Sequence, residues 1–550
     1  MLIMEKRLAI CLLVILLLAM GTRTIEGANI LGVFSSYSPS HVIVHMAVVK
    51  TLADRGHNIT VVTQMEPKFQ PHENVTVIVA LPTPEQEALT RAYMERVSSE
   101  KESFWSFLAN LLLRPSPVLH GQYEWTLHPK VKSLYENPQT KYDLVILGLM
   151  LNDFQLGIAA KLRCPVIITW VGVPMPFTDS QVGNIDDPSY VPSVNVALEP
   201  GHLTMGFGMR FVNFFKNSFL KIVNVLIRHK MNEFYNQAFA NNSDPDFPSY
   251  YEMKRRISLL FYNYHAPSEG PIRPTVPQSI EIGGIQVKEK PDPLAKDLAE
   301  FLDNSTNGAI FFSLGTNVKF SGIRPQIVEI LYKVLSKLPQ RVVWKWEDME
   351  STPGNSSNIY FSNWLPQDDI LAHPKTRLFI THAGKGGIAE AQFHGVPMLA
   401  FPIFADQPGN AEIMAKSGFG LHLDILTLTE KALEETIREL LENPSYRASV
   451  GRFSALYRDR PLTARQSVVY WTEYVLRHQG AYHLQSPLLH MDIVARHNLD
   501  VYGTLLLFGL VTLLLLRLVF RYIFRKVLSF VRGHSYRPKA SNSKLKDKIF

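Results

Sequence analysis

Apolar runs alternate with amphipathic stretches along most of the chain, and the first such unit begins near residue 29. NILGVFSS reads as a buried strand, HVIVHMAVVKTLADRG has apolar residues at helical spacing, and HNITVVTQ reads as a second strand. We expect Ser40 to cap the helix, because serine is a favoured N-cap residue. A strand, a helix and a strand in this order predict a parallel sheet.

The pattern recurs on both sides of the sequence IGGIQVKEKPDP, which is rich in Gly, Pro and Lys and reads as a linker from residue 282 to 293. Strand-like runs before it include PVIITWV, and those after it include AIFFSLGTNV, RVVWKWE and RLFIT. We therefore predict an α/β chain with two domains, residues 28–284 and 285–480.

Both ends of the chain carry apolar segments of a different kind. Residues 1–27 have Lys6 and Arg7, a short apolar run and then small and polar residues, the layout of a secretory signal peptide. A juxtamembrane linker is expected at 481–498, and residues 499–520 are nearly uninterrupted hydrocarbon, long enough for one transmembrane helix. The basic residues of the tail, 521–550, predict that the tail is cytosolic.

Charge and cysteine content narrow the possible partners. The net charge of +7 comes largely from the last thirty residues, where nine Lys or Arg face only Asp547, so we expect no nucleic-acid partner. Of the two cysteines, Cys11 lies in the predicted signal peptide, so the mature chain would hold no internal disulfide. Entry into the secretory pathway would make glycosylation possible at five sequons, which begin at Asn58, Asn74, Asn241, Asn304 and Asn355.

The segment RLFITHAGKGG, followed by a helical pattern, is the strongest chemical signal in the sequence. Glycines at 384, 386 and 387 let the backbone turn tightly and approach a ligand closely, and the helix that follows offers free N–H groups and a positive dipole end. This combination favours a phosphate site, although glycines alone would more often indicate a plain turn.

The residues around this loop suit the other parts of a nucleotide sugar. An indole ring can stack a base, a carboxylate can accept hydrogen bonds from ribose hydroxyls, and an Asp–Gln pair can bind sugar hydroxyls. The residues in question are Trp364, Gln367, Glu390, Asp406 and Gln407. With W-x-P-Q, T-H-x-G, Glu eight residues after the His and D-Q 24 residues after it, the stretch resembles the UDP-glycosyltransferase family motif.

The resemblance implies a GT-B architecture of two Rossmann-like domains, with the UDP-sugar in the C-terminal one. It implies that Trp364 stacks uracil, Gln367 and Glu390 bind ribose, His382 and the loop Gly384, Gly386 and Gly387 hold the diphosphate, and Asp406 and Gln407 bind the hexose. Gly315 and Thr316 end a predicted strand and could touch phosphate, and Lys345 stands where relatives often have Arg. Ala383 and Gly386 depart from the family's loop, so one phosphate contact is in doubt.

His41 is the candidate catalytic base. It lies in the first turn of a helix at the tip of a strand, where the positive helix end favours neutral imidazole. By position it could equally cap or pack, and the four-residue spacing to His45 is a weak zinc signal without a third ligand. The family carries its base in a matching S-H segment, which implies His41. Gly148 occupies the vertebrate family's Asp position, so Asp153 is the expected partner carboxylate, with Asp143 behind it.

Together these features predict inverting, metal-independent transfer of a hexose, with no cofactor besides the UDP-sugar as co-substrate. The expected acceptor is a hydroxyl of a small lipophilic molecule, as in detoxification. Glucose is the expected sugar, through the arthropod-like sequence ADQPGNAE; glucuronate, a sterol or lipid acceptor, and a non-catalytic binding protein are alternatives. We expect a type I endoplasmic-reticulum membrane protein with lumenal domains, an address that a C-terminal di-lysine pattern favours. A homo-oligomer is a further candidate arrangement.

Overall fold

The computed structural model describes residues 27–99, 117–193, 204–240, 244–316, 318 and 320–534 of the 550-residue chain. The predicted signal peptide, the sequon at Asn241 and the tail beyond residue 534 therefore lie outside the described residues. The chain forms two compact units, residues 1–486 and residues 487–550.

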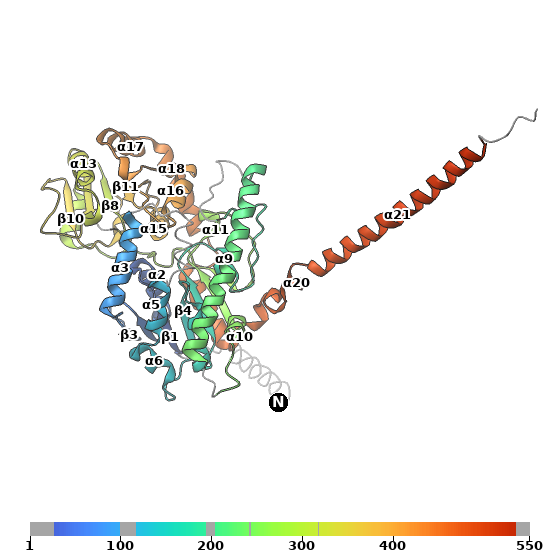
Figure 1. Cartoon of the computed structure of the whole chain (residues 1–550). Coiled ribbons are helices and arrows are strands. Elements are labelled where there is room, and N and C mark those ends of the chain that lie inside the picture. Colours follow the sequence, from blue (N-terminus) through green and yellow to red (C-terminus); the bar gives the residue numbers. More distant parts are fainter. Residues whose placement is uncertain are drawn as a thin grey trace, which may run out of the picture. The chain divides into compact units, whose positions relative to one another are not determined.

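Within the described residues, the first unit contains two parallel β-sheets (Figure 1). The first sheet has the order β3-β2-β1-β4-β5-β6-β7, and β1 pairs in parallel with both β2 and β4. Its strands are β1 (Asn29–Phe34), β2 (Asn58–Thr63), β3 (Val75–Val79), β4 (Leu144–Gly148), β5 (Val166–Trp170), β6 (Ile257–Tyr262) and β7 (Ser279–Glu281). The predicted β-α-β unit and the α/β class are confirmed.

The second sheet begins after the predicted linker and has the order β10-β9-β8-β11-β12-β13. In it, β11 pairs in parallel with β8 on one side and with β12 on the other. Its strands are β8 (Ala309–Ser313), β9 (Arg341–Lys345), β10 (Ile359–Ser362), β11 (Thr376–Thr381), β12 (Met398–Ala400) and β13 (Gly420–His422). The two sheets define an N-terminal lobe and a C-terminal lobe.

Helices connect the strands and cover the sheets, as parallel pairing requires. The N-terminal lobe has α2 (Pro39–Asp54), α3 (Pro84–Ser99), α5 (Pro117–Thr126), α6 (Pro129–Glu136), α7 (Leu156–Leu162), α8 (Pro176–Asp179), α9 (Phe207–Phe239), α10 (Tyr250–Arg255) and α11 (Ala266–Glu269). After the linker come α12 (Lys296–Asp303), α13 (Pro325–Leu335), α14 (Gln367–Ala372), α15 (Lys385–His394), α16 (Gln407–Lys416), α17 (Glu430–Glu442), α18 (Pro444–Arg458) and α19 (Ala464–Arg477).

Each sheet is buried on both faces, which explains why its strands read as continuous apolar runs. Along β1, Leu31 and Val33 join one core cluster, whereas Ile30 and Phe34 join the cluster on the opposite face. The second sheet repeats this division between two clusters of its own. Because successive side chains point to opposite faces, two cores per sheet follow from the strand period of two.

Helix α19 packs away from the lobe that precedes it in sequence. Val468 and Val475 are seven residues apart, which places them on one helix face, and both belong to the core cluster of α2 and β1. Residues 464–477 fall within the predicted second domain, but their apolar face is buried against the first sheet's helices. The helix thus ties the end of the C-terminal lobe's sequence to the N-terminal lobe.

The second unit consists of α20 (Ile493–Arg496) and the 36-residue α21 (Leu499–His534). Within Leu499–Arg532, an 18-residue window has a mean hydropathy of 2.3 and is not buried, so this helix is long and apolar enough to cross a membrane. The helix continues beyond the predicted span of 499–520 through Arg521, Arg525 and Lys526. Arg and Lys are good helix formers, so the change from apolar to basic residues does not end the helix.

Candidate active site

A cavity with a volume of about 2810 Å³ is lined by residues of both lobes. Its N-terminal wall includes His41 and part of α9, and its C-terminal wall includes the loops that follow β8, β11 and β12. These loops leave the carboxyl ends of parallel strands, the usual place for a ligand in an open α/β sheet. The structure therefore brings His41 and the expected donor residues to one cavity.

The loop between β11 and α15 is built around the imidazole of His382. A Cβ added at Gly384 would lie 2.4 Å from Nε2 of His382, and a Cβ at Gly315 would lie 2.5 Å from its Cε1. Glycine at both positions is thus required for the ring to lie between the two loops. Burial lowers the pKa of His382 to about 4, and the charge of Lys345 adds to this. The ring is neutral at pH 7 and can donate one hydrogen bond to a phosphate oxygen.

The remaining loop residues differ in what they require: one adopts a left-handed backbone conformation, and the others are small residues beside the cavity. Ala383 adopts φ = 61°, a left-handed conformation that glycine would adopt without strain. Gly386 faces open space, with Nε2 of Gln286 as the nearest atom to an added Cβ at 3.9 Å, and Gly387 packs near Gln367. Ala383 thus adopts a conformation in which glycine would be unstrained, and the small residue at 386 leaves the cavity open.

Polar atoms on the same wall lack protein partners. Nδ1 of His382 and Oγ1 of Thr316 are both buried, and neither has a hydrogen-bond partner in the described part of the chain. Nζ of Lys345 donates to the carbonyl of Gly315. Unpartnered buried polar atoms are costly unless a ligand or water satisfies them, so this corner is suited to a ligand rich in acceptor oxygens.

The residues expected to hold base and ribose lie together at α14 and α15. Trp364 is 43% exposed. The Nζ atoms of Lys345 and of Lys68, which belongs to the N-terminal lobe, lie 5.6 and 5.5 Å from the centroid of its ring. The side-chain amide of Gln367 donates to the carboxyl of Glu390. Burial, with the charge of Asp368, raises the pKa of Glu390 to about 8. An aromatic face and an amide–carboxyl pair are thus presented side by side.

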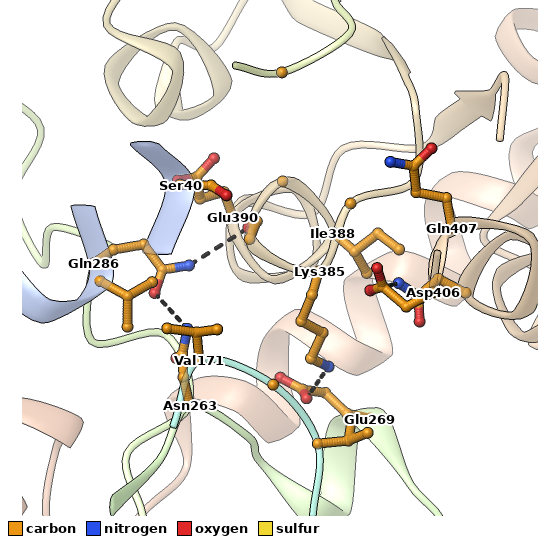
Figure 2. A pocket seen from close by; sticks show the side chains of 18 of the residues that line it. Ser40, Val171, Asn263, Glu269, Gln286, Lys385, Ile388, Glu390, Asp406 and Gln407 are labelled. Carbon is orange, nitrogen blue, oxygen red and sulfur yellow. Dashed lines mark hydrogen bonds and ion pairs between the residues drawn. The ribbon is translucent and has the colours of Figure 1, made fainter. Parts of the chain in front are cut away.

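Asp406 and Gln407, expected to bind the hexose, lie at the start of α16 (Figure 2). Oε1 of Gln407 accepts hydrogen bonds from the backbone N–H groups of Ile403 and Phe404, at 2.9 and 3.1 Å. Oδ2 of Asp406 accepts from the amide of Asn410 at 2.6 Å. The pair is therefore held by its own loop, and both residues line the cavity.

His41 lies in the first turn of α2, as predicted, but the predicted cap is wrong. The helix begins at Pro39 with Ser38 as its N-cap residue, and the N–H of His41 donates to the carbonyl of Ser38 at 3.1 Å. Proline is favoured at the first helical position, which explains the earlier start. Burial lowers the pKa of His41 to about 4, so the ring is neutral as expected, although burial rather than the helix end is the cause.

Asp153 does not meet His41. Its carboxylate accepts hydrogen bonds from the hydroxyl of Tyr250 at 2.7 Å, the ammonium of Lys254 at 3.1 Å and the amide of Gln181 at 3.0 Å. Nδ1 of His41 has no hydrogen-bond partner among the described residues. The structure does not support the expected pairing, because the carboxylate is bound by Lys254, a buried cation of α10.

The alternatives to Asp153 are no closer to a catalytic partner. Asp143 precedes β4 and accepts from the backbone N–H of Asn29 at 2.8 Å, at the opposite ends of these strands from the cavity. A Cβ at Gly148 would lie 2.8 Å from Nε2 of His45, which stacks on Phe34 at 4.8 Å. The space that a side chain at position 148 would need is filled by His45. His41 thus lines the cavity without a carboxylate on its Nδ1 in the described part of the chain.

Helix α9 supplies much of the apolar wall. Phe219, Val223 and Ile227 line the cavity, whereas Phe211 and Phe214 lie on the exposed side at 56% and 54% exposure. The aromatic residues of this helix therefore divide between two faces. One face is suited to a lipophilic molecule in the cavity.

Two residues that the sequence did not single out meet in the cavity. Lys385, in the glycine-rich loop, forms an ion pair with Glu269 of the N-terminal lobe (Figure 2). The pair spans 116 residues of sequence, so spacing alone could not reveal it. The signal that was available is the lysine itself, a single charged residue within HAGKGG.

Comparisons with known proteins agree with this arrangement. Residues 30–533 match the family model described as "UDP-glucoronosyl and UDP-glucosyl transferase". UDP-glucosyltransferase 2 of Dactylopius coccus is 32% identical over 97% of this chain and 99% of its own length. UDP-glucuronosyltransferase 2B15 of Homo sapiens is 28% identical over 85% of this chain and 88% of its own.

The solved structures confirm the architecture. "Spinosyn Forosaminyltransferase SpnP" aligns with a TM-score of 0.50 and 16% identity over 82% of this chain and 99% of its own, which shows a shared fold of two parallel-sheet α/β domains, GT-B. The family model covers both lobes and most of the C-terminal helix. The chain therefore belongs to the family of UDP-glucuronosyl and UDP-glucosyl transferases, and it is a UDP-glycosyltransferase.

Proposed function

We propose that the protein transfers glucose from UDP-glucose to a hydroxyl of a small lipophilic acceptor, with inversion at the anomeric carbon. The observation that carries the proposal is the single cavity in which the glycine-rich loop faces His41 and the apolar side of α9. In this proposal residues 285–480 hold the donor and residues 28–284 hold the acceptor, and the acceptor approaches from the face opposite UDP.

The donor residues keep the roles that the family motif implies. Trp364 stacks uracil, Gln367 and Glu390 bind the ribose, and Asp406 with Gln407 binds the hexose. The diphosphate lies against His382, Gly384, Gly386 and Gly387, with Gly315, Thr316 and Lys345 beside it. The unpartnered atoms of His382 and Thr316 support this placement, because diphosphate oxygens would satisfy both.

His41 is the proposed base. The acceptor oxygen forms a bond to the anomeric carbon, the bond from that carbon to UDP breaks, and the acceptor's hydroxyl proton passes to His41. A pKa of about 4 makes His41 a weak base, and the structure places no carboxylate on its Nδ1 within the described residues. The proposal therefore favours acidic hydroxyls such as phenols, with the leaving diphosphate stabilised by the loop and the helix end.

The names of the relatives indicate two different donor sugars, so the test must distinguish between these donors. The Dactylopius coccus relative is named a glucosyltransferase, and the human one a glucuronosyltransferase. Detergent extracts of the expressed chain should convert phenols with radiolabelled UDP-glucose and not with UDP-glucuronate. The reverse would replace the donor, a sterol as sole acceptor would replace the acceptor, and no transfer with retained UDP binding would indicate a non-catalytic binding protein.

The apolar C-terminal helix and the relatives fit a single-pass membrane protein. We infer that the protein resides in the endoplasmic-reticulum membrane with both lobes in the lumen, where conjugation of lipophilic compounds would serve detoxification. The apolar segment at the N-terminus and the basic residues after residue 520 support this orientation.

A further inference from the structure

Lys385 stands at a place in the fold that is unfavourable for a cation. It is the first residue of α15, directly after the N-cap residue Gly384. The N-terminus of a helix carries a partial positive charge, so a cation in the first turn is destabilising unless an anion lies nearby. The nearby anion in this structure is Glu269, the last residue of α11 in the other lobe.

The pair is largely shielded from solvent, and it is held from the Glu269 side. The side chain of Lys385 is 15% exposed and that of Glu269 is 2% exposed. The hydroxyl of Tyr457 donates to Oε1 of Glu269 at 2.7 Å, and the ammonium of Lys385 lies 5.7 Å from the ring of Tyr264. Glu269 is thus anchored by a second partner, whereas the lysine reaches it at the end of a flexible side chain.

Lys385 also acts on the donor wall. Desolvation raises the pKa of Asp406, and a hydrogen bond from Asn410 and the charge of Lys385 oppose this rise. In Figure 2 the lysine side chain extends from α15 to Glu269, and Asp406 lies to one side of it. A small movement of its end would carry the ammonium from Glu269 towards a ligand held by the glycine-rich loop.

We propose that Glu269 occupies the place of a donor anion, and that Lys385 leaves Glu269 to bind an anionic oxygen of the donor when the donor enters. This inference rests on the proposed function, because it needs a UDP-sugar at the loop. Two donor groups carry the required chemistry: the diphosphate, and the carboxylate of a glucuronyl group. In either case Glu269 competes with the donor for one cation.

This competition predicts that removing the charge of Lys385 and removing the charge of Glu269 change the affinity for the donor in opposite directions. In the full-length protein in detergent, Lys385→Gln should weaken binding of the anion about 10-fold, because a charge-assisted hydrogen bond is lost. Glu269→Gln should tighten binding about 3- to 10-fold, because the competitor is removed. If the pair were only a structural link between the lobes, both substitutions would shift the affinity in the same direction.

Calorimetric titration with UDP, UDP-glucose and UDP-glucuronate identifies the anion. If Lys385 binds the diphosphate, the affinities for all three ligands change; if it binds a carboxylate, only the affinity for UDP-glucuronate changes. The control is Arg55→Gln, which breaks the ion pair of Arg55 with Glu473 at 2.8 Å, two residues that are not among the described residues lining the cavity. Its affinities should equal those of the wild type.

The same set of experiments includes controls for the charge at position 385 and for the stability of each variant. Lys385→Arg keeps the cation and should keep most of the affinity, and thermal melting identifies any variant that fails to fold. A wild-type protein that binds no UDP would remove the proposed function and this inference together. A wild type that binds UDP, with Lys385→Gln and Glu269→Gln unchanged or shifted in the same direction, would overturn this inference alone.

Discussion

His41 lines the cavity, and its Nδ1 has no carboxylate partner in the described part of the chain, so its proposed role as the base can be tested by substitution. Replacing it with alanine should lower kcat about 10²- to 10⁴-fold, the usual contribution of a positioned base, while UDP binding is retained. Activity against a phenol and UDP titration of the same preparation check both statements. Wild-type turnover by His41→Ala would show that the base lies elsewhere.

A weak base should also make the rate depend on the acidity of the acceptor. With a pKa of about 4, His41 removes a proton more readily from an acidic phenol than from an alkanol. Across a series of para-substituted phenols of similar size, kcat/KM should fall as the acceptor pKa rises. A flat series would mean that bond formation to the sugar does not involve proton transfer to this ring in the rate-limiting step.

Glu390 predicts a pH dependence of donor binding. Its pKa is raised to about 8, chiefly by burial, so at pH 7 the carboxyl is mostly protonated in the empty site. Ribose hydroxyls that donate to a carboxylate favour its charged form, so UDP binding should release close to one proton at pH 7. Affinity should therefore increase with pH up to about 8 and level off above it.

Calorimetry of UDP binding in buffers with different ionisation enthalpies measures this release directly. Glu390→Gln cannot titrate, so its binding enthalpy should show no such buffer dependence, and its affinity should not change between pH 6 and pH 8 on account of this position. Binding by the wild type without proton release would mean that the ribose meets a protonated carboxyl.

At the scale of elements, α9 has one face that lines the cavity and one face that is exposed. Phe219→Ala should raise KM for a lipophilic acceptor about 10-fold, because the apolar contact of one aromatic ring is lost. UDP affinity should not change. Phe214→Ala is the matched control, since it removes the same ring from the exposed face of the same helix. Equal effects of the two substitutions would place the acceptor elsewhere.

The elements themselves were largely predictable, because strands buried on both faces leave continuous apolar runs in the sequence. The runs beginning at Asn29, Ala309 and Arg377 correspond to β1, β8 and β11. The glycine-rich loop after β11 could also be recognised from the sequence. In the structure, glycine at 384 leaves room for the ring of His382. Features that depend on neighbouring residues, such as strands and glycine-rich turns, can therefore be predicted from a single sequence.

Pairings between distant residues were not predictable. Asp153 follows a strand end that points to the cavity, but its partners, Tyr250 and Lys254, come about a hundred residues later. The side-chain amide of Asn152, one residue earlier, donates to Oγ of Ser35, which directly follows β1, at 2.9 Å. Sequence places a residue near a strand end, whereas tertiary packing decides which side chains it contacts.

At the scale of the whole molecule, the orientation across the membrane determines which sequons can carry glycans. A lumenal body exposes its sequons to the glycosylation machinery, whereas a cytosolic body does not. Asn58, Asn304 and Asn355 are exposed, but Asn74 is half-buried and its amide donates to the carbonyl of Ala53 at 3.4 Å. We therefore expect glycans at the three exposed asparagines and not at Asn74.

Endoglycosidase treatment of the full-length protein from microsomes measures this. Each occupied site should give one step in gel mobility, and replacing Asn58, Asn304 or Asn355 by Gln should remove one step each, whereas Asn74→Gln should remove none. A chain ended after residue 498 lacks the apolar helix and should be released by alkaline carbonate, whereas the full chain should remain with the membrane. A full chain that keeps its membrane association but carries no glycan would place the lobes on the cytosolic side, because the same helix can anchor the protein in either orientation.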